Sequence, residues 1–105
     1  IITVQNFRSD YGEIDIVAEN PKTVAFVEVK TRKADSLVEP KNAVDKAKQR
    51  KLAITAKKFL KMAMLGDIKY RFDIAEVTYA RDESGALKYS LNYIKNAFFY
   101  DLSDD

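Results

Sequence analysis

The order of apolar and polar residues predicts five strands and one long helix. Alternation with a period of two, which is typical of half-buried strands, recurs in short segments separated by turn residues. A continuous apolar run, Val24 to Val27, indicates a central strand covered on both faces. The elements are expected at residues 1–7, 13–18, 24–32, 40–65, 69–79 and 87–94, in the order strand, strand, strand, helix, strand, strand.

The predicted helix is expected to cover one face of the sheet. Pro40 suits the first turn of a helix, and no further helix-breaking residue follows before Leu65. Apolar residues recur at spacings of three and four, which places them on a single stripe. The stripe consists of Val44, Ala47, Leu52, Ala56, Phe59, Leu60 and Ala63.

The stretch from Tyr11 to Arg32 has the pattern of a β-hairpin with charges at its open end. A turn centred on Pro21 and Lys22 would place Asp15 opposite Glu28 and Glu13 opposite Lys30, whereas a loop with an odd number of residues would shift this pairing by one. Two facing carboxylates repel each other, so a positive group is expected between them. Lys30 and a divalent metal such as Mg²⁺ are both candidates.

Composition narrows the kinds of chemistry that are available. The 105 residues are 47% apolar, enough for one domain with a modest core, and they include neither cysteine nor histidine. Disulfides, thiolate zinc sites, cysteine nucleophiles and a histidine base are therefore excluded. We find neither an apolar run long enough to cross a membrane nor the layout of a signal peptide, so a cytoplasmic location without membrane contact is expected.

Positive charge is concentrated on the predicted helix. The formal net charge of the chain is only +2, yet residues 40–65 contain eight Lys and Arg residues against one acid, Asp45. Such a face is suited to a nucleic-acid backbone, although lysine-rich helix faces are often only solvated. Because few acids are available as partners along the helix, we favour binding.

Several short motifs occur in an order and spacing that resemble the YraN family of endonuclease-like bacterial proteins. Asp15 followed after a turn by Glu28-Val29-Lys30 also resembles the PD-(D/E)xK nuclease core. The matching segments are Asn6-Phe7-Arg8, Gly12-Glu13-Ile14-Asp15, Phe26-Val27-Glu28-Val29-Lys30-Thr31-Arg32, Pro40, Ala43-Val44, Lys48, Arg71-Phe72-Asp73 and Asn96-Ala97-Phe98.

The resemblance implies an α/β fold of the restriction-endonuclease-like class, with a mixed sheet of about five strands flanked by one long basic helix. Residues 1–105 would form a single endonuclease-like domain. Members of the family begin with a helix bearing a glutamate near the metal site. This chain opens on a strand-like segment instead, so the resemblance predicts that this helix is missing here.

The resemblance also implies a catalytic site for phosphodiester hydrolysis. Asp15, Glu28 and the carbonyl of Val29 would hold Mg²⁺ or Mn²⁺, which activates a bound water. Lys30 would orient or deprotonate that water and offset charge on phosphorus. Glu13 would influence Lys30 or support the metal site from the second shell of contacts.

Nucleic acid is the partner that this hypothesis requires, with DNA favoured over RNA. Arg32, Lys48, Lys51 and Lys58 would contact phosphates without reading bases, so binding should depend on the structure of the nucleic acid rather than its sequence. Two alternatives remain open: a nucleic-acid-binding module that does not cleave, and a protein-interaction domain. A homodimer is also left open.

Arg71 and Asp73 allow two interpretations. They are two positions apart on the strand predicted at residues 69–79, so their side chains point to the same face. They would either form a structural ion pair, which we favour, or support the metal site.

Overall fold

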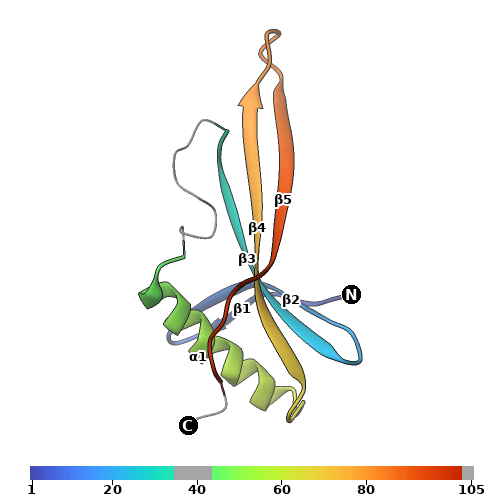
Figure 1. Ribbon diagram of the computed structural model, residues 1–105, viewed down its shortest axis with the longest axis vertical. Coiled ribbons are helices and arrows are strands. Elements are labelled where there is room, and N and C mark those ends of the chain that lie inside the picture. The colour runs from blue at the N-terminus through green and yellow to red at the C-terminus, as the bar shows by residue number, and fades with distance from the viewer. Residues whose placement is uncertain (35–43, 103–105) are drawn as a thin grey trace.

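The computed structural model describes residues 1–34 and 44–102, and it contains the predicted elements in the predicted order (Figure 1). The last strand continues beyond its expected end at residue 94. The elements are β1 (Ile2–Ser9), β2 (Gly12–Glu19), β3 (Thr23–Lys33), α1 (Lys46–Met62), β4 (Lys69–Arg81) and β5 (Leu87–Phe98).

The five strands form one mixed sheet in the order β1-β2-β3-β4-β5. Neighbouring strands are antiparallel except β3 and β4, which are parallel and are connected by the segment that contains α1. A parallel pair requires such a crossover connection, which is usually helical. The predicted α/β fold, a mixed sheet of five strands with one helix, is confirmed.

The hairpin of β2 and β3 has the register predicted from its turn. Val17 pairs with Phe26, and Ile16 pairs with Val27. The side chain of Asn20 closes the turn by accepting hydrogen bonds from the backbone N–H groups of Lys22 and Thr23, both at 2.8 Å. The paired residues end at Ile16 and Val27, although both strands continue beyond them. The charged residues Asp15 and Glu28 therefore lie where the ladder stops.

The predicted start of the helix is wrong. Asp45 is the N-cap of α1, with extended backbone angles and a side chain that accepts a hydrogen bond from the backbone N–H of Lys48. A capping carboxylate satisfies one of the free donors at a helix start, so the sequence signal was Asp45 and not the earlier proline. Pro40 itself lies outside the described residues.

The apolar stripe of the helix is shorter than predicted. Leu52, Ala56 and Phe59 are buried as expected, but Ala47 and Ala63 are exposed. Ala47 lies in the first turn and Ala63 is the C-cap, so both belong to the ends of the helix. Short side chains at such ends bury little area, which makes them weak evidence for burial.

The main core lies between α1 and one face of the sheet. Phe26 lies at its centre and makes ring contacts with Phe59 of α1 and Phe72 of β4, with centroids 6.0 and 5.5 Å apart. A smaller cluster on the opposite face consists of Ala25, Val27 and Ala75. Even-numbered and odd-numbered side chains of β3 therefore point to opposite faces of the sheet, and Glu28 lies on the helix-facing side with Phe26.

The predicted alternation fails in the middle of β2. Ile14 and Val17 both belong to the helix-facing core, whereas Ile16 packs with the cluster on the opposite face. Regular alternation would place Ile14 and Ile16 together. On β1, Asn6 has a φ of 56° and lies between the residues paired with Ile14 and Ile16. This local irregularity changes which face the side chains occupy, next to Asp15.

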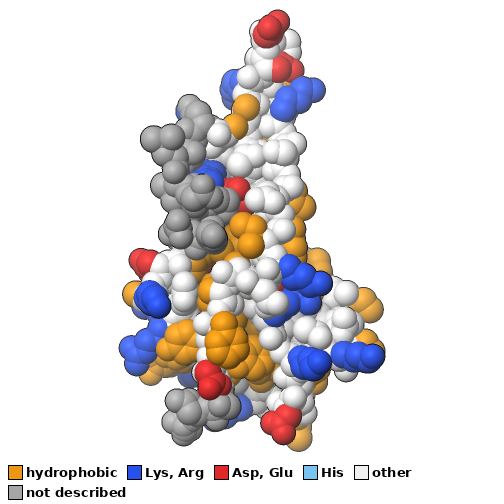
Figure 2. Space-filling view, viewed as in Figure 1, with side chains coloured by type: hydrophobic (Ala, Val, Ile, Leu, Met, Phe, Trp, Pro, Cys, Tyr) orange, Lys and Arg blue, Asp and Glu red, His pale blue; other side chains and the backbone are white. Residues whose placement is uncertain are grey.

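The β4–β5 hairpin extends well beyond the rest of the fold (Figure 1). Acidic side chains lie at its tip, with basic side chains just below them (Figure 2). No helix among the described residues has the length and apolar character needed to cross a lipid bilayer.

Candidate functional site

Three charged residues at alternating positions of β3 form the basis of the candidate site. Glu28, Lys30 and Arg32 follow Phe26 along the helix-facing side of the strand. The apolar core ends at this point, because the next side chains on this side of the strand are charged. α1 begins beside them and contributes Lys48 from its first turn.

Glu28 is the most buried member of this group. Its side chain is 7% exposed, and Oε2 lies 3.2 Å from the Nζ atoms of both Lys30 and Lys48. A buried carboxylate loses its hydration and needs such partners to stay charged. The sequence predicts Lys30 as a partner of this carboxylate, whereas it predicts a phosphate-binding role for Lys48.

Asp15 lies next to this cluster through the backbone of β3. One of its carboxylate oxygens, Oδ2, accepts a hydrogen bond of 2.8 Å from the N–H of Val29. Val29 lies beyond the last paired residues of the β2–β3 ladder, so this side-chain hydrogen bond holds Asp15 of β2 beside the residue that follows Glu28 on β3. That the two carboxylates share one site stays a prediction from the sequence.

The protein donors at this point are two carboxylates and the backbone of Val29. Among the described residues, no group of three or more His, Cys, Asp or Glu side chains is arranged to hold a metal. Mg²⁺ keeps several waters and is commonly held by one or two carboxylates, so oxygen donors of this number and kind fit that ion or Mn²⁺. They do not fit zinc, which prefers nitrogen and sulfur ligands.

Two residues predicted to act near the site have other partners. Arg32 forms an ion pair with Glu76 of β4, whose side chain is 5% exposed. Glu13 forms an ion pair with Arg8 of β1 at 3.4 Å, whereas Lys30, its predicted neighbour, contacts Glu28. The charge of Arg32 therefore stabilises a buried acid on the same face of the sheet.

Lys51 and Lys58, both predicted to bind phosphate, are exposed on α1. The ammonium of Lys58 lies over the ring of Tyr11, 5.3 Å from its centroid, and the stem of Lys51 lies close to Gly12. Both positions follow from the packing of α1 against the β1–β2 turn, where the buried Thr55 hydroxyl also bonds to Ser9 at 2.7 Å.

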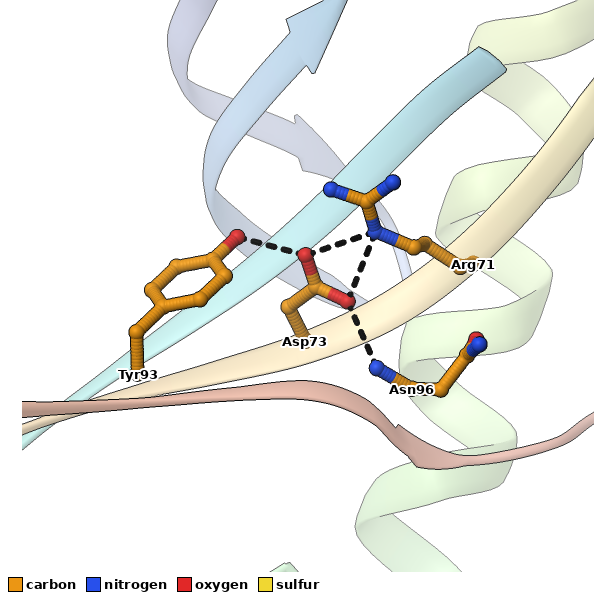
Figure 3. A network of polar contacts seen from close by, with 4 residues as sticks. All are labelled: Arg71, Asp73, Tyr93 and Asn96. Carbon is orange, nitrogen blue, oxygen red and sulfur yellow. Dashed lines mark hydrogen bonds and ion pairs between the residues drawn. The ribbon is translucent and has the colours of Figure 1, made fainter.

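Arg71 and Asp73 form an ion pair within a larger network on the opposite face of the sheet (Figure 3). Asp73 is buried, and it also accepts hydrogen bonds from the Tyr93 hydroxyl and the Asn96 backbone N–H. Burial, together with the hydrogen bond to Asp73, raises the pKa of Tyr93 to about 12. The pKa of Arg71 is raised because its hydrogen bond and ion pair with Asp73 outweigh its own desolvation.

Sequence reasoning missed three partners of these charges: Lys48 for Glu28, Glu76 for Arg32, and Tyr93 for Asp73. A signal existed for Glu76, because it continues the alternation of Phe72 and Ile74, which are both core residues. A charge in such a position requires a partner on a neighbouring strand. The contact of Lys48 crosses from helix to strand and leaves no comparable periodic signal.

Comparisons with known proteins add a family match. Residues 1–77 match the family described as "Uncharacterised protein family UPF0102". A UPF0102 protein of Clostridium perfringens strain 13 is 39% identical over 97 residues, which cover 92% of this chain and 77% of the relative. One from Caldicellulosiruptor saccharolyticus is 40% identical over 94 residues, 90% of this chain and 77% of the relative. One from Desulforapulum autotrophicum is 42% identical over 97 residues.

Proposed function

The chain belongs to the UPF0102 family of uncharacterised proteins, the family in which YraN is placed, and we propose that it is a metal-dependent nuclease that hydrolyses phosphodiester bonds. The observation that carries the proposal is the position of Asp15 where the β2–β3 ladder ends: its carboxylate accepts a hydrogen bond from the N–H of Val29, the residue that follows Glu28. Two acids at a strand end, with a lysine two residues after one of them, match the chemistry of metal-assisted hydrolysis.

Asp15, Glu28 and the Val29 carbonyl would hold Mg²⁺ or Mn²⁺ in this proposal. One oxygen of Asp15 is held by the Val29 N–H, which fixes the orientation of its carboxylate. Once bound, the ion would polarise a phosphoryl oxygen and lower the pKa of a water molecule.

Lys30 would act on the water and on the phosphate. Its Nζ is already directed to Glu28, and its side chain is 29% exposed, so it is accessible to a substrate at the surface. From there the ammonium would orient the attacking water and offset the negative charge that develops on the phosphate oxygens.

Exposed lysines of α1 would hold the nucleic-acid backbone. Lys51 and Lys58 are exposed on the helix that carries Lys48. A nucleic-acid backbone whose phosphates contact these lysines would therefore pass close to Glu28. Contacts of this kind read the backbone and not the bases, which favours selection by nucleic-acid structure, with DNA as the expected substrate. We assign Arg32 a smaller share, because its charge is engaged by Glu76.

The test compares Asp15→Asn and Glu28→Gln with the unmodified protein. Cleavage of duplex, single-stranded, flap and four-way DNA is followed with Mg²⁺ or Mn²⁺, and binding is followed separately by fluorescence polarisation. Both variants should lose cleavage and retain binding, because the acids hold the ion while α1 holds the backbone. Glu83→Gln, which changes an exposed acid in the distant hairpin turn, is the matched control and should cleave normally.

A second function is a nucleic-acid-binding module without activity. The observation that favours it is the neutralisation of Glu28 by two lysines, which stabilises the buried acid without any metal. If no substrate shows cleavage that Glu28→Gln removes, while binding falls steeply with salt, the binding module replaces the nuclease.

A further inference from the structure

The Glu28 carboxylate contacts two positive groups, one more than its own charge requires. One lysine would neutralise the carboxylate, yet Oε2 is 3.2 Å from two ammonium groups, those of Lys30 and Lys48. We infer that Lys48 acts as a competitor of the metal at Glu28 and couples metal binding to nucleic-acid binding. This inference rests on the proposed function, because it assigns a regulatory contact to the same site.

A divalent cation at Glu28 would meet strong repulsion from both lysines. The ion would bind the carboxylate that both lysines now contact, and like charges this close repel strongly even where water screens them. Asp15 and Glu28 together carry two negative charges, which balance the charges of Lys30 and Lys48. They do not balance the two further positive charges of the metal. One ammonium must therefore move away when the metal enters.

Lys48 is the lysine that leaves more easily. Its side chain is 44% exposed, against 29% for Lys30, so solvent already reaches more of it. The backbone N–H of Lys48 is fixed by Asp45 at 2.8 Å, so the helix stays in place while the flexible stem of the lysine swings. Lys30 extends from the same strand as Glu28 and remains close to it.

A phosphodiester would give Lys48 a new partner. The group carries one negative charge and binds an ammonium in the open, where Lys48 would lie after leaving Glu28. Metal entry frees Lys48 for the phosphate, and the phosphate keeps Lys48 away from the metal. Each ligand should then strengthen the binding of the other by the same factor, as linkage requires.

The experiment measures Mn²⁺ binding to the intact protein by electron paramagnetic resonance, with and without a short single-stranded oligonucleotide. Lys48→Gln should bind Mn²⁺ about tenfold more tightly than the unmodified protein when nucleic acid is absent, because one repulsive charge is gone. The oligonucleotide should strengthen Mn²⁺ binding to the unmodified protein and have little effect on the variant.

Lys46→Gln is the matched control, since it removes the same charge from an exposed position in the same helical turn. It should change Mn²⁺ affinity by less than about twofold, as expected for a screened surface charge. Circular dichroism checks that both variants keep the fold. Equal or weaker Mn²⁺ binding by Lys48→Gln would overturn the inference and leave the nuclease proposal standing. Absence of Mn²⁺ binding by every form would overturn both.

Discussion

Replacing Asp73 tests whether its polar network with Arg71 and Tyr93 stabilises the fold or supports a metal. The Asp73 side chain is fully buried and receives hydrogen bonds from Arg71, Tyr93 and Asn96. In Asp73→Ala the guanidinium of Arg71 loses its buried counter-charge, and removing one member of a buried ion pair typically costs about 3 to 5 kcal/mol. Arg71 and Tyr93 are partly exposed, so water replaces some of the lost bonds. We therefore expect the lower end, about 3 kcal/mol.

Thermal and urea unfolding followed by circular dichroism measure this loss. For a domain of this size, about 3 kcal/mol should lower Tm by more than about 10 °C. Asp67→Ala, which removes an exposed acid in the turn after α1, is the control and should change stability by less than about 0.5 kcal/mol. A similarly small effect of Asp73→Ala would refute the structural role. A loss that appears only when Mg²⁺ is present would favour the alternative, in which Asp73 supports a metal.

Three further predictions concern pH, an ion pair and a helix contact. Because the pKa of Tyr93 is raised to about 12, the unfolded state loses the phenol proton at a lower pH than the folded state. The free energy of unfolding should therefore fall by about 1 kcal/mol between pH 10 and 12, and urea titrations of Tyr93→Phe should not show that fall. Glu76→Gln should lower the free energy of unfolding by about 2 kcal/mol, and the Arg32→Met, Glu76→Leu double variant, in which neither charge remains, should recover much of it. Thr55→Val should cost about 1 kcal/mol in the same assay, since the Ser9 hydroxyl loses its hydrogen bond to Thr55 and keeps only the one from the Tyr11 N–H among those of the described residues.

Much of the fold could be predicted because its signals are local. Period-two alternation identified the strands, and the turn at Pro21 fixed the register that pairs Val17 with Phe26. The same register brought Asp15 and Glu28 to the end of one ladder. These features depend on residues that are close in sequence, where backbone geometry leaves few alternatives.

The contacts that set the chemistry of the site could not be predicted in this way. Lys48 approaches Glu28 only after α1 has docked on the sheet, and helix periodicity does not say which lysine faces a strand. The start of α1 depended on Asp45, whose cap competes with the helix preference of the preceding residues. Near Asp15, the positive φ of Asn6 changes side-chain direction without an apolar signal.

The balance of charge distinguishes Glu28 from the other buried acid on the helix-facing side. Glu76 forms an ion pair with Arg32, and the two side chains are only 5% and 21% exposed. Glu28 meets two ammonium groups, and the outer one, Lys48, is 44% exposed. A structural ion pair needs no excess charge, and holding a second lysine beside the first costs repulsion. The excess at Glu28 is accessible to solvent, which is where an anionic phosphate would arrive, so this acid is the better candidate for function.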